Sequence, residues 1–175
     1  VTIAAARRGL ALFGDSWAVG LWTFSTEVDG ARPWRENVPI GPLTAQRAQL
    51  AAALNAIRPK VNGGTGLYDT TLAAYKAVQE DWEPGRVNSV VVMTDGVNEN
   101  PAGISRKKLL DELRRIADPE RPIQVIMIGI GSGVNKEELE SIVEVTGGGA
   151  FVAEDPTKIG DIFLKAISLR PRANR

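Results

Sequence analysis

Apolar and polar positions along the chain follow two different periods, and each change of period marks a change between strand and helix. Runs of β-branched and aromatic residues that are apolar on both faces predict buried strands, whereas apolar positions three and four residues apart predict amphipathic helices. We expect strands at residues 18–25, 34–38, 89–94, 123–130 and 150–153. We expect helices at residues 1–13, 44–57, 67–82 and 105–117, after Asn135, and after the pair Asp155-Pro156.

Capping and breaking residues support these boundaries. Thr44 is placed to cap the second helix, and Asn135 followed three residues later by Glu138 forms a pair of the capping-box type. The prolines between residues 33 and 42 leave room for only a short edge strand at 34–38. In the first helix the spacing places Ile3, Ala6, Leu10 and Phe13 on one face.

Hydrophobic strands that alternate with helices indicate an α/β fold. We predict a three-layer, doubly wound, mostly parallel sheet with helices on both faces and one antiparallel edge strand. A chain of 175 residues suits a single domain, which we assign to residues 1–170, and we expect residues 171–175 to form a disordered tail.

The composition excludes several kinds of chemistry. The chain has neither histidine nor cysteine, so it has no histidine general base, no nucleophilic Ser-His-Asp or Cys-His pair, and no histidine or cysteine ligand for zinc. Any metal site must use oxygen ligands, which favour Mg²⁺, Mn²⁺ or Ca²⁺. Lys and Arg number 21, as do Asp and Glu, so no basic excess favours nucleic acid or an anionic membrane as a partner.

Candidate site residues should lie in the loops at the carboxyl ends of the strands, where open α/β sheets bind ligands. These loops are Ser25-Thr26, residues 95–103 and residues 131–135. Asp95 follows a buried strand and precedes a glycine, which suits either a ligand-binding carboxylate or an ordinary Asp-Gly turn.

The glycine-rich segment at residues 62–66 carries Thr65 and joins two predicted helices. Thr65 is placed either to cap the following helix or to reach the carboxyl edge of the sheet. The segment is not a phosphate-binding loop, because a helix precedes it and no Lys-Ser/Thr pair follows it. The glycines of residues 129–133 lack the dinucleotide-binding spacing and predict close packing at a turn.

The ordered motifs of the chain resemble the von Willebrand factor A family. VGLWTFST, NGGTGLYDT, VVVMTDGVNEN, IMIGIG and VTGGGAFVAEDP occur in the order and spacing of that family. The resemblance implies a Rossmann-like fold and a non-enzymatic module that binds proteins through a metal-ion-dependent adhesion site. It is closest to bacterial, actinobacterial-like proteins of the cell envelope, so it favours an extracytoplasmic location.

The same resemblance implies roles for individual residues. Thr65 and Asp95 would bind Mg²⁺, or Mn²⁺ or Ca²⁺, and a protein partner would offer an acidic side chain to the ion. Partner-binding loops would include Ser25, Thr26, Gly64, Asn98 and Glu99, while no nucleic acid and no direct membrane contact are expected. Two alternatives remain: a scaffold subunit in a chelatase- or ATPase-linked complex, and a Mg²⁺-dependent hydrolase, for which Asp95 has no positioned partner.

The chain departs from the family in one respect. It contains no Asp-x-Ser-x-Ser sequence, which in the family follows the first strand and supplies three further oxygen ligands. That strand would lie in the middle of the sheet, between the strands expected at 18–25 and 89–94. We therefore expect an incomplete metal site and an unfilled strand position, to be filled by an upstream segment, filled by another chain, or left open at the expense of folding.

Overall fold

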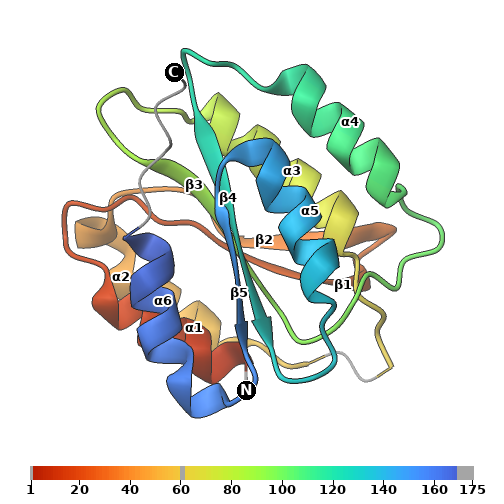
Figure 1. Cartoon of the computed structure of the whole chain (residues 1–175). Coiled ribbons are helices and arrows are strands. Elements are labelled where there is room, and N and C mark those ends of the chain that lie inside the picture. The colour runs from red at the N-terminus through yellow and green to blue at the C-terminus, as the bar shows by residue number, and fades with distance from the viewer. Residues whose placement is uncertain (1, 60–61, 169–175) are drawn as a thin grey trace.

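The computed structural model describes residues 2–59 and 62–168, which form a three-layer α/β arrangement (Figure 1). The helices are α1 (Thr2–Leu12), α2 (Leu43–Ala56), α3 (Leu67–Glu80), α4 (Arg106–Ile116), α5 (Lys136–Thr146) and α6 (Ile159–Ile167), with a 3₁₀ turn η1 (Pro156–Lys158) before α6. The strands are β1 (Leu21–Asp29), β2 (Arg32–Val38), β3 (Asn88–Thr94), β4 (Ile123–Ile130) and β5 (Gly149–Ala153). The predicted tail at 171–175 lies outside the described residues.

The strands form two separate sheets. β3, β4 and β5 are parallel in that order, with Val90 opposite Val125 and Met127 opposite Ala150. β1 and β2 form an antiparallel hairpin in which Phe24 lies opposite Trp34. The predicted α/β class with a parallel sheet and flanking helices is confirmed, whereas the antiparallel strand β2 pairs with β1 in a separate two-stranded sheet.

Alternate residues of the central strand β4 enter two different cores, which is why all eight of its residues are buried. Val125 and Met127 pack into a cluster with residues of α3, α4 and α5, whereas Ile126 and Ile128 pack against α1 and α6. Figure 1 shows these helices on opposite sides of the parallel sheet. A third cluster, around Leu43 and Leu50, joins α2 to β2.

The predicted face of helix α1 is only partly buried, although Leu10 and Phe13 pack against the apolar clusters. Ala5 and Gly9 are buried, whereas Ile3 and Ala6 are only partly so. A Cβ atom at Gly9 would lie 2.7 Å from the Phe163 ring, so the small residues allow α1 to approach α6 closely. Close packing between helices therefore buries Ala5 and Gly9 as well, which the apolar spacing did not predict.

Several element boundaries also differ from the predictions. β1 begins at Leu21 and continues to Asp29, so Ser25 and Thr26 lie within the strand and not in a loop after it. α2 begins at Leu43 without a side-chain cap, because the carbonyl of Trp17 accepts the Leu43 N–H at 2.8 Å and Thr44 is not needed. α3 ends at Glu80, two residues before the predicted end.

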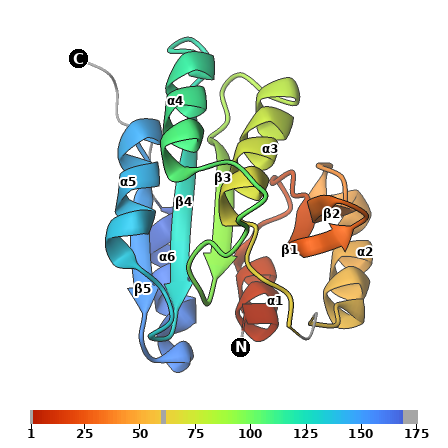
Figure 2. The same ribbon diagram turned by 90° about the vertical axis from the view of Figure 1, so that its right-hand side faces the viewer.

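The position between β1 and β3 is unfilled within the described part of the chain. Neither strand pairs with the other, and Figure 2 shows the β1–β2 hairpin set apart from β3. Phe24 of β1 nevertheless packs against the same cluster as Val90 and Val92 of β3. We call the space between these two unpaired edges the strand gap. Val91 and Met93 on β3 are only partly buried, in contrast to every residue of β4.

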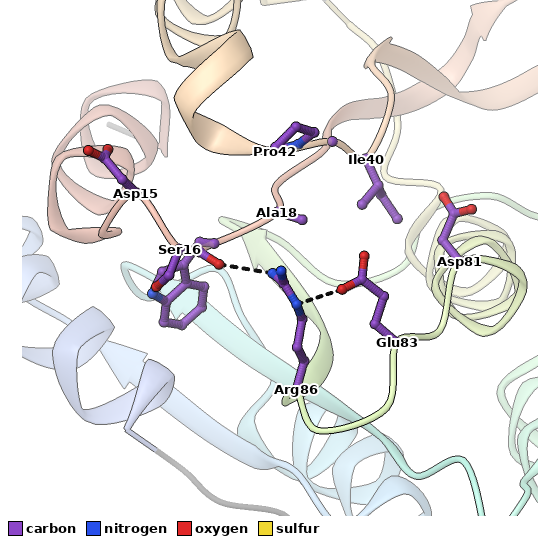
Figure 3. Close-up of a pocket in the computed structure, with 10 residues that line it drawn as sticks. Asp15, Ser16, Ala18, Ile40, Pro42, Asp81, Glu83 and Arg86 are labelled. Atoms are coloured by element: carbon purple, nitrogen blue, oxygen red, sulfur yellow. Dashed lines mark hydrogen bonds and ion pairs between the residues drawn. The ribbon is translucent and has the colours of Figure 1, made fainter.

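A cavity of about 430 Å³ opens at the amino end of the strand gap (Figure 3). Its lining comes from the segment before β1, from the start of α2 and from the turn between α3 and β3. Arg86 crosses it, donating a hydrogen bond to the carbonyl of Ser16 at 2.9 Å and pairing with Glu83 at 2.5 Å. No helix among the described residues is both long and apolar enough to cross a bilayer.

Candidate functional site

The carboxyl end of β3 presents Asp95 to solvent. Thr94, the last residue of the strand, is buried, and its hydroxyl donates to the carbonyl of Gly96 at 3.0 Å. The same hydroxyl lies 3.3 Å from the Gly96 N–H, so it fixes a tight turn. Asp95 sits at the apex of this turn and is exposed.

Thr65 lies against the same turn, although its loop joins two helices. A Cβ atom built on Gly96 would be 3.5 Å from the Thr65 hydroxyl, and the Glu99 N–H donates to the carbonyl of Thr65 at 2.8 Å. The loop therefore reaches the carboxyl edge of the sheet and places Thr65 beside the segment that carries Asp95. It does not cap α3, whose N-cap residue is Gly66 and has no side-chain capping bond.

Gly64 connects this pair of loops to β1. Its carbonyl accepts the Thr26 N–H at 2.8 Å and the Ser25 hydroxyl at 3.1 Å, and its own N–H donates to the Thr26 hydroxyl at 2.9 Å. On the other side, a Cβ atom at Gly64 would lie 2.6 Å from the carbonyl oxygen of Glu99. Glycine is required because the backbone passes between two segments that both touch it.

Asn98 and the first turn of α3 complete the cluster. The Asn98 side-chain oxygen accepts the N–H of Tyr68 at 3.3 Å. The loop before α5 packs onto the same place, since a Cβ atom at Gly133 would lie 2.6 Å from the carbonyl oxygen of Asp95. All seven predicted site residues therefore gather at one edge of the molecule: Ser25, Thr26, Gly64, Thr65, Asp95, Asn98 and Glu99.

The side chains of Thr65 and Asp95 are available to a ligand. Within residues 2–59 and 62–168 neither side chain forms a hydrogen bond or ion pair with another residue. A threonine hydroxyl and a carboxylate are oxygen donors of the kind that hard divalent cations take. However, no group of three or more acidic, histidine or cysteine residues in the described part of the chain is arranged to hold a metal.

Three residues that the sequence analysis did not assign to the site organise its loops. Asp69 accepts hydrogen bonds from the Asn100 amide at 3.1 Å and from the Ile104 N–H at 3.3 Å, so it fixes the far end of the loop after β3. The Tyr68 hydroxyl donates to the buried carboxylate of Glu138. Burial, together with the hydrogen bond to Glu138, raises the pKa of Tyr68 above its usual value. The sequence signal that was available for Asp69 was an acidic residue in the first turn of α3.

A comparison with known families identifies the fold. The model of the von Willebrand factor type A domain matches residues 5–165, nearly the whole described chain. The chain belongs to the von Willebrand factor type A family. The resemblance inferred from the sequence motifs is therefore confirmed.

Relatives of known sequence are much longer than this domain. Two uncharacterized proteins of Mycobacterium tuberculosis, from strains CDC 1551 / Oshkosh and ATCC 25618 / H37Rv, are each 32% identical to the chain over 152 residues. The alignment covers 83% of this chain but 21% of each relative. The chain thus spans about a fifth of the length of the curated relatives that it matches.

Solved structures share the fold at low sequence identity. A von Willebrand factor type A protein from Catenulispora acidiphila has a TM-score of 0.69 at 18% identity, covering 93% of this chain and 37% of that one. Proximal thread matrix protein 1 from the mussel byssus, with a zinc-occupied MIDAS motif, has a TM-score of 0.66 at 18% identity and covers 99% and 42%. BatB from Bacteroides thetaiotaomicron has a TM-score of 0.66 at 15% identity and covers 95% and 84%.

Proposed function

We propose that this von Willebrand factor type A domain binds a protein ligand through the carboxyl edge of its sheet, with a divalent cation at Thr65 and Asp95 assisting the contact. The observation that carries the proposal is the convergence of these two residues, which come from separate loops and have no other partner among the described residues. Family domains commonly bind proteins, and one structural neighbour holds zinc in its MIDAS motif.

The chemistry of the two residues fits a hard cation, but their number does not complete its shell. Mg²⁺ takes six oxygen ligands in near-octahedral geometry, and Thr65 and Asp95 supply two side chains. Water, a carboxylate of the partner and residues supplied at the strand gap would have to provide the rest. When bound, the ion supplies a positive charge that attracts the partner's carboxylate.

The surrounding loops would then choose the partner. Asn98 and Glu99 follow Asp95 in sequence, and Thr26 borders the same edge through Gly64. Because Glu99 is exposed beside the cation position, it would disfavour ligands that carry further acidic groups. We also propose an extracytoplasmic location for the whole protein, to be tested by fractionation of cells that express it at full length.

Paramagnetic broadening by Mn²⁺ tests the metal component directly, because it detects weak sites. In amide NMR spectra, low Mn²⁺ should broaden Thr65 and Gly96 before other residues. Asp95→Asn should remove this selective effect. Asp81→Asn, an exposed aspartate at the opposite edge of the sheet, is the matched control and should retain it. Equal broadening in wild type and Asp95→Asn would disprove a cation at this place.

A pair of short peptides tests the protein-binding component. A hexapeptide with a central glutamate, added with Mg²⁺, should shift the Thr65, Gly96 and Asn98 amides, and the matching glutamine peptide should not. The shift should disappear when Mg²⁺ is removed by a chelator. Identical shifts from both peptides, or shifts that persist without the ion, would contradict a metal-bridged carboxylate.

A further inference from the structure

The side chain of Glu138 does not make the capping hydrogen bond that its sequence position predicts. Asn135 and Glu138 have the spacing of a capping box, in which the glutamate would return to the backbone N–H of the cap residue. The first half of that arrangement forms, since the Glu138 N–H donates to the Asn135 side chain at 2.9 Å. The Glu138 carboxylate instead turns into the protein, where the residue is only 6% exposed.

This buried carboxylate contacts both loops of the site. One oxygen, Oε1, accepts a hydrogen bond from the Tyr68 hydroxyl and lies 3.5 Å from the Asn98 N–H. The Asn98 side chain in turn accepts the Tyr68 N–H. The three residues therefore form a closed set of contacts that joins α5, the first turn of α3 and the loop after β3.

The stability of α5 does not account for the burial of the Glu138 carboxylate. Burial of a carboxylate is costly unless its oxygens are satisfied, and the second oxygen, Oε2, has no hydrogen-bond partner among the described residues. The N-terminus of α5 is already capped by Asn135. The burial instead provides two contacts, to Tyr68 and Asn98, each of which is three residues from a proposed cation ligand.

We infer that Glu138 is a positioning residue that holds Thr65 and Asp95 in register with each other. Tyr68 fixes the chain that follows Thr65, and Asn98 fixes the chain that follows Asp95, so one carboxylate constrains both. The inference rests on the proposed function for its purpose, because register between the two residues matters for binding a shared ligand.

Glu138→Leu is the test, since leucine fills the buried site and removes the acceptor. Hydrogen exchange should become about five- to tenfold faster at the hydrogen-bonded amides of Gly96, Asn98 and Glu99 and stay unchanged in β4, while the melting temperature stays near that of wild type. Glu138→Gln keeps an acceptor oxygen and should restore slow exchange. Glu137→Gln, the exposed neighbour in the same turn, should have no effect.

Two results would overturn the inference: unchanged loop exchange in Glu138→Leu, or faster exchange that affects β4 equally. The first would mean that the loops hold their positions without Glu138, and the second that its role is general stability. If the wild-type protein gives no Mn²⁺ response, the proposed function is disproved, but the role of Glu138 is not, because the exchange measurement needs no metal. In Glu138→Leu we also expect selective Mn²⁺ broadening at Thr65 and Gly96 to require several-fold more Mn²⁺.

Discussion

Gly64 shows how a single missing side chain determines the distance between segments. Its backbone lies between Thr26 on β1 and the Glu99 carbonyl on the loop after β3. A methyl group there would meet backbone on one side and a side-chain methyl on the other, so neither neighbour can give way cheaply. The position of Thr65 beside Asp95 therefore depends on the absence of a Cβ atom one residue earlier.

Gly64→Ala should therefore lower the free energy of unfolding by about 1–3 kcal/mol. It should also separate the Thr65 and Asp95 loops, seen as amide shift changes at Thr65 and Gly96. The control is Gly160→Ala in α6, where a Cβ atom meets nothing within 4 Å and the helix gains slightly. Chemical denaturation of both variants measures the difference, and equal stability of the two would contradict the packing argument.

The two tyrosines of the chain give a prediction about alkaline pH. Burial raises the pKa of Tyr75, and burial with the Glu138 contact raises the pKa of Tyr68. A group whose pKa is raised in the folded state binds its proton more tightly there, so its contribution to stability is complete below pH 10. That contribution falls as the pH rises above this value.

Tyrosinate absorbance at alkaline pH therefore should not rise around pH 10 in the folded protein. It should appear together with the loss of the near-ultraviolet circular dichroism signal at higher pH. Tyr75→Phe leaves Tyr68 as the sole tyrosine and should show the same delay. A simple titration near pH 10 in the folded state would mean that the Tyr68 hydroxyl is not held by Glu138.

Helices α4 and α5 have the same type of N-terminal cap, but the caps lie in different surroundings. Ser105 accepts the Lys108 N–H at 3.1 Å and Asn135 accepts the Glu138 N–H at 2.9 Å. α4 lies on the outside of the domain with its charges paired along its own surface, as between Lys108 and Glu112. α5 instead carries Glu138 toward the site, so its start is coupled to the loops there.

Ser105→Ala and Asn135→Ala should each lower the free energy of unfolding by about 1 kcal/mol. Their effects on the site should differ: only Asn135→Ala should shift the amides of Tyr68 and Asn98, through Glu138. Denaturation gives the first comparison and NMR shifts the second. Shifts of equal size in both variants would mean that α5 is not specially coupled to the site.

The elements were predictable where local pattern decides them, and less so where packing does. The run at 123–130 was placed correctly because a strand that is buried on both faces is apolar throughout. β1 was misjudged because its second half, after Phe24, leaves the regular register with β2 and includes Glu27 at a φ of 51°. A bulge of this kind has no strong signature in an apolar pattern.

The site residues also differ in whether a local pattern or tertiary packing determines their place. The position of Thr65 and Asp95 at the carboxyl edge was predictable, since glycine neighbours and a position after a buried strand are local features. Glu138 was predicted only as a cap partner, because its contact with Tyr68 joins residues 70 positions apart in the chain. Contacts over such distances depend on tertiary structure and were beyond the periodic patterns that located the elements.

The domain contains two sheets that are not hydrogen-bonded to each other, and the strand gap between β1 and β3 separates them. β3 offers an unpaired edge toward β1, and partly exposed Val91 and Met93 lie along it. Unpaired edges of this kind attract an additional strand, because backbone N–H and C=O groups gain hydrogen bonds from it. The domain spans about a fifth of the length of its Mycobacterium relatives.

The nature of the strand that fits the gap follows from its surroundings. Apolar clusters cover both faces, one that includes Phe24 and Val92 and another that includes Met93, so the strand should be apolar on both sides. If it runs parallel to β3, it ends at the edge that carries Thr65 and Asp95. Acidic and hydroxyl side chains placed directly after it would then complete the oxygen ligands of a cation.

We therefore expect a synthetic peptide of seven apolar, β-branched residues followed by Asp-x-Ser-x-Ser to bind residues 1–175 and raise the melting temperature. Hydrogen exchange should slow along β3 and β1, and selective Mn²⁺ broadening at Thr65 should begin at lower Mn²⁺.

A peptide with prolines at alternate strand positions should do neither, since it cannot pair. A peptide in which Asp-x-Ser-x-Ser becomes Asn-x-Ala-x-Ala should still protect β3 but leave Mn²⁺ binding unchanged. Protection confined to the outer edge of β5 would instead show that the gap is closed to strands, and the oxygen ligands would then have to come from the partner protein.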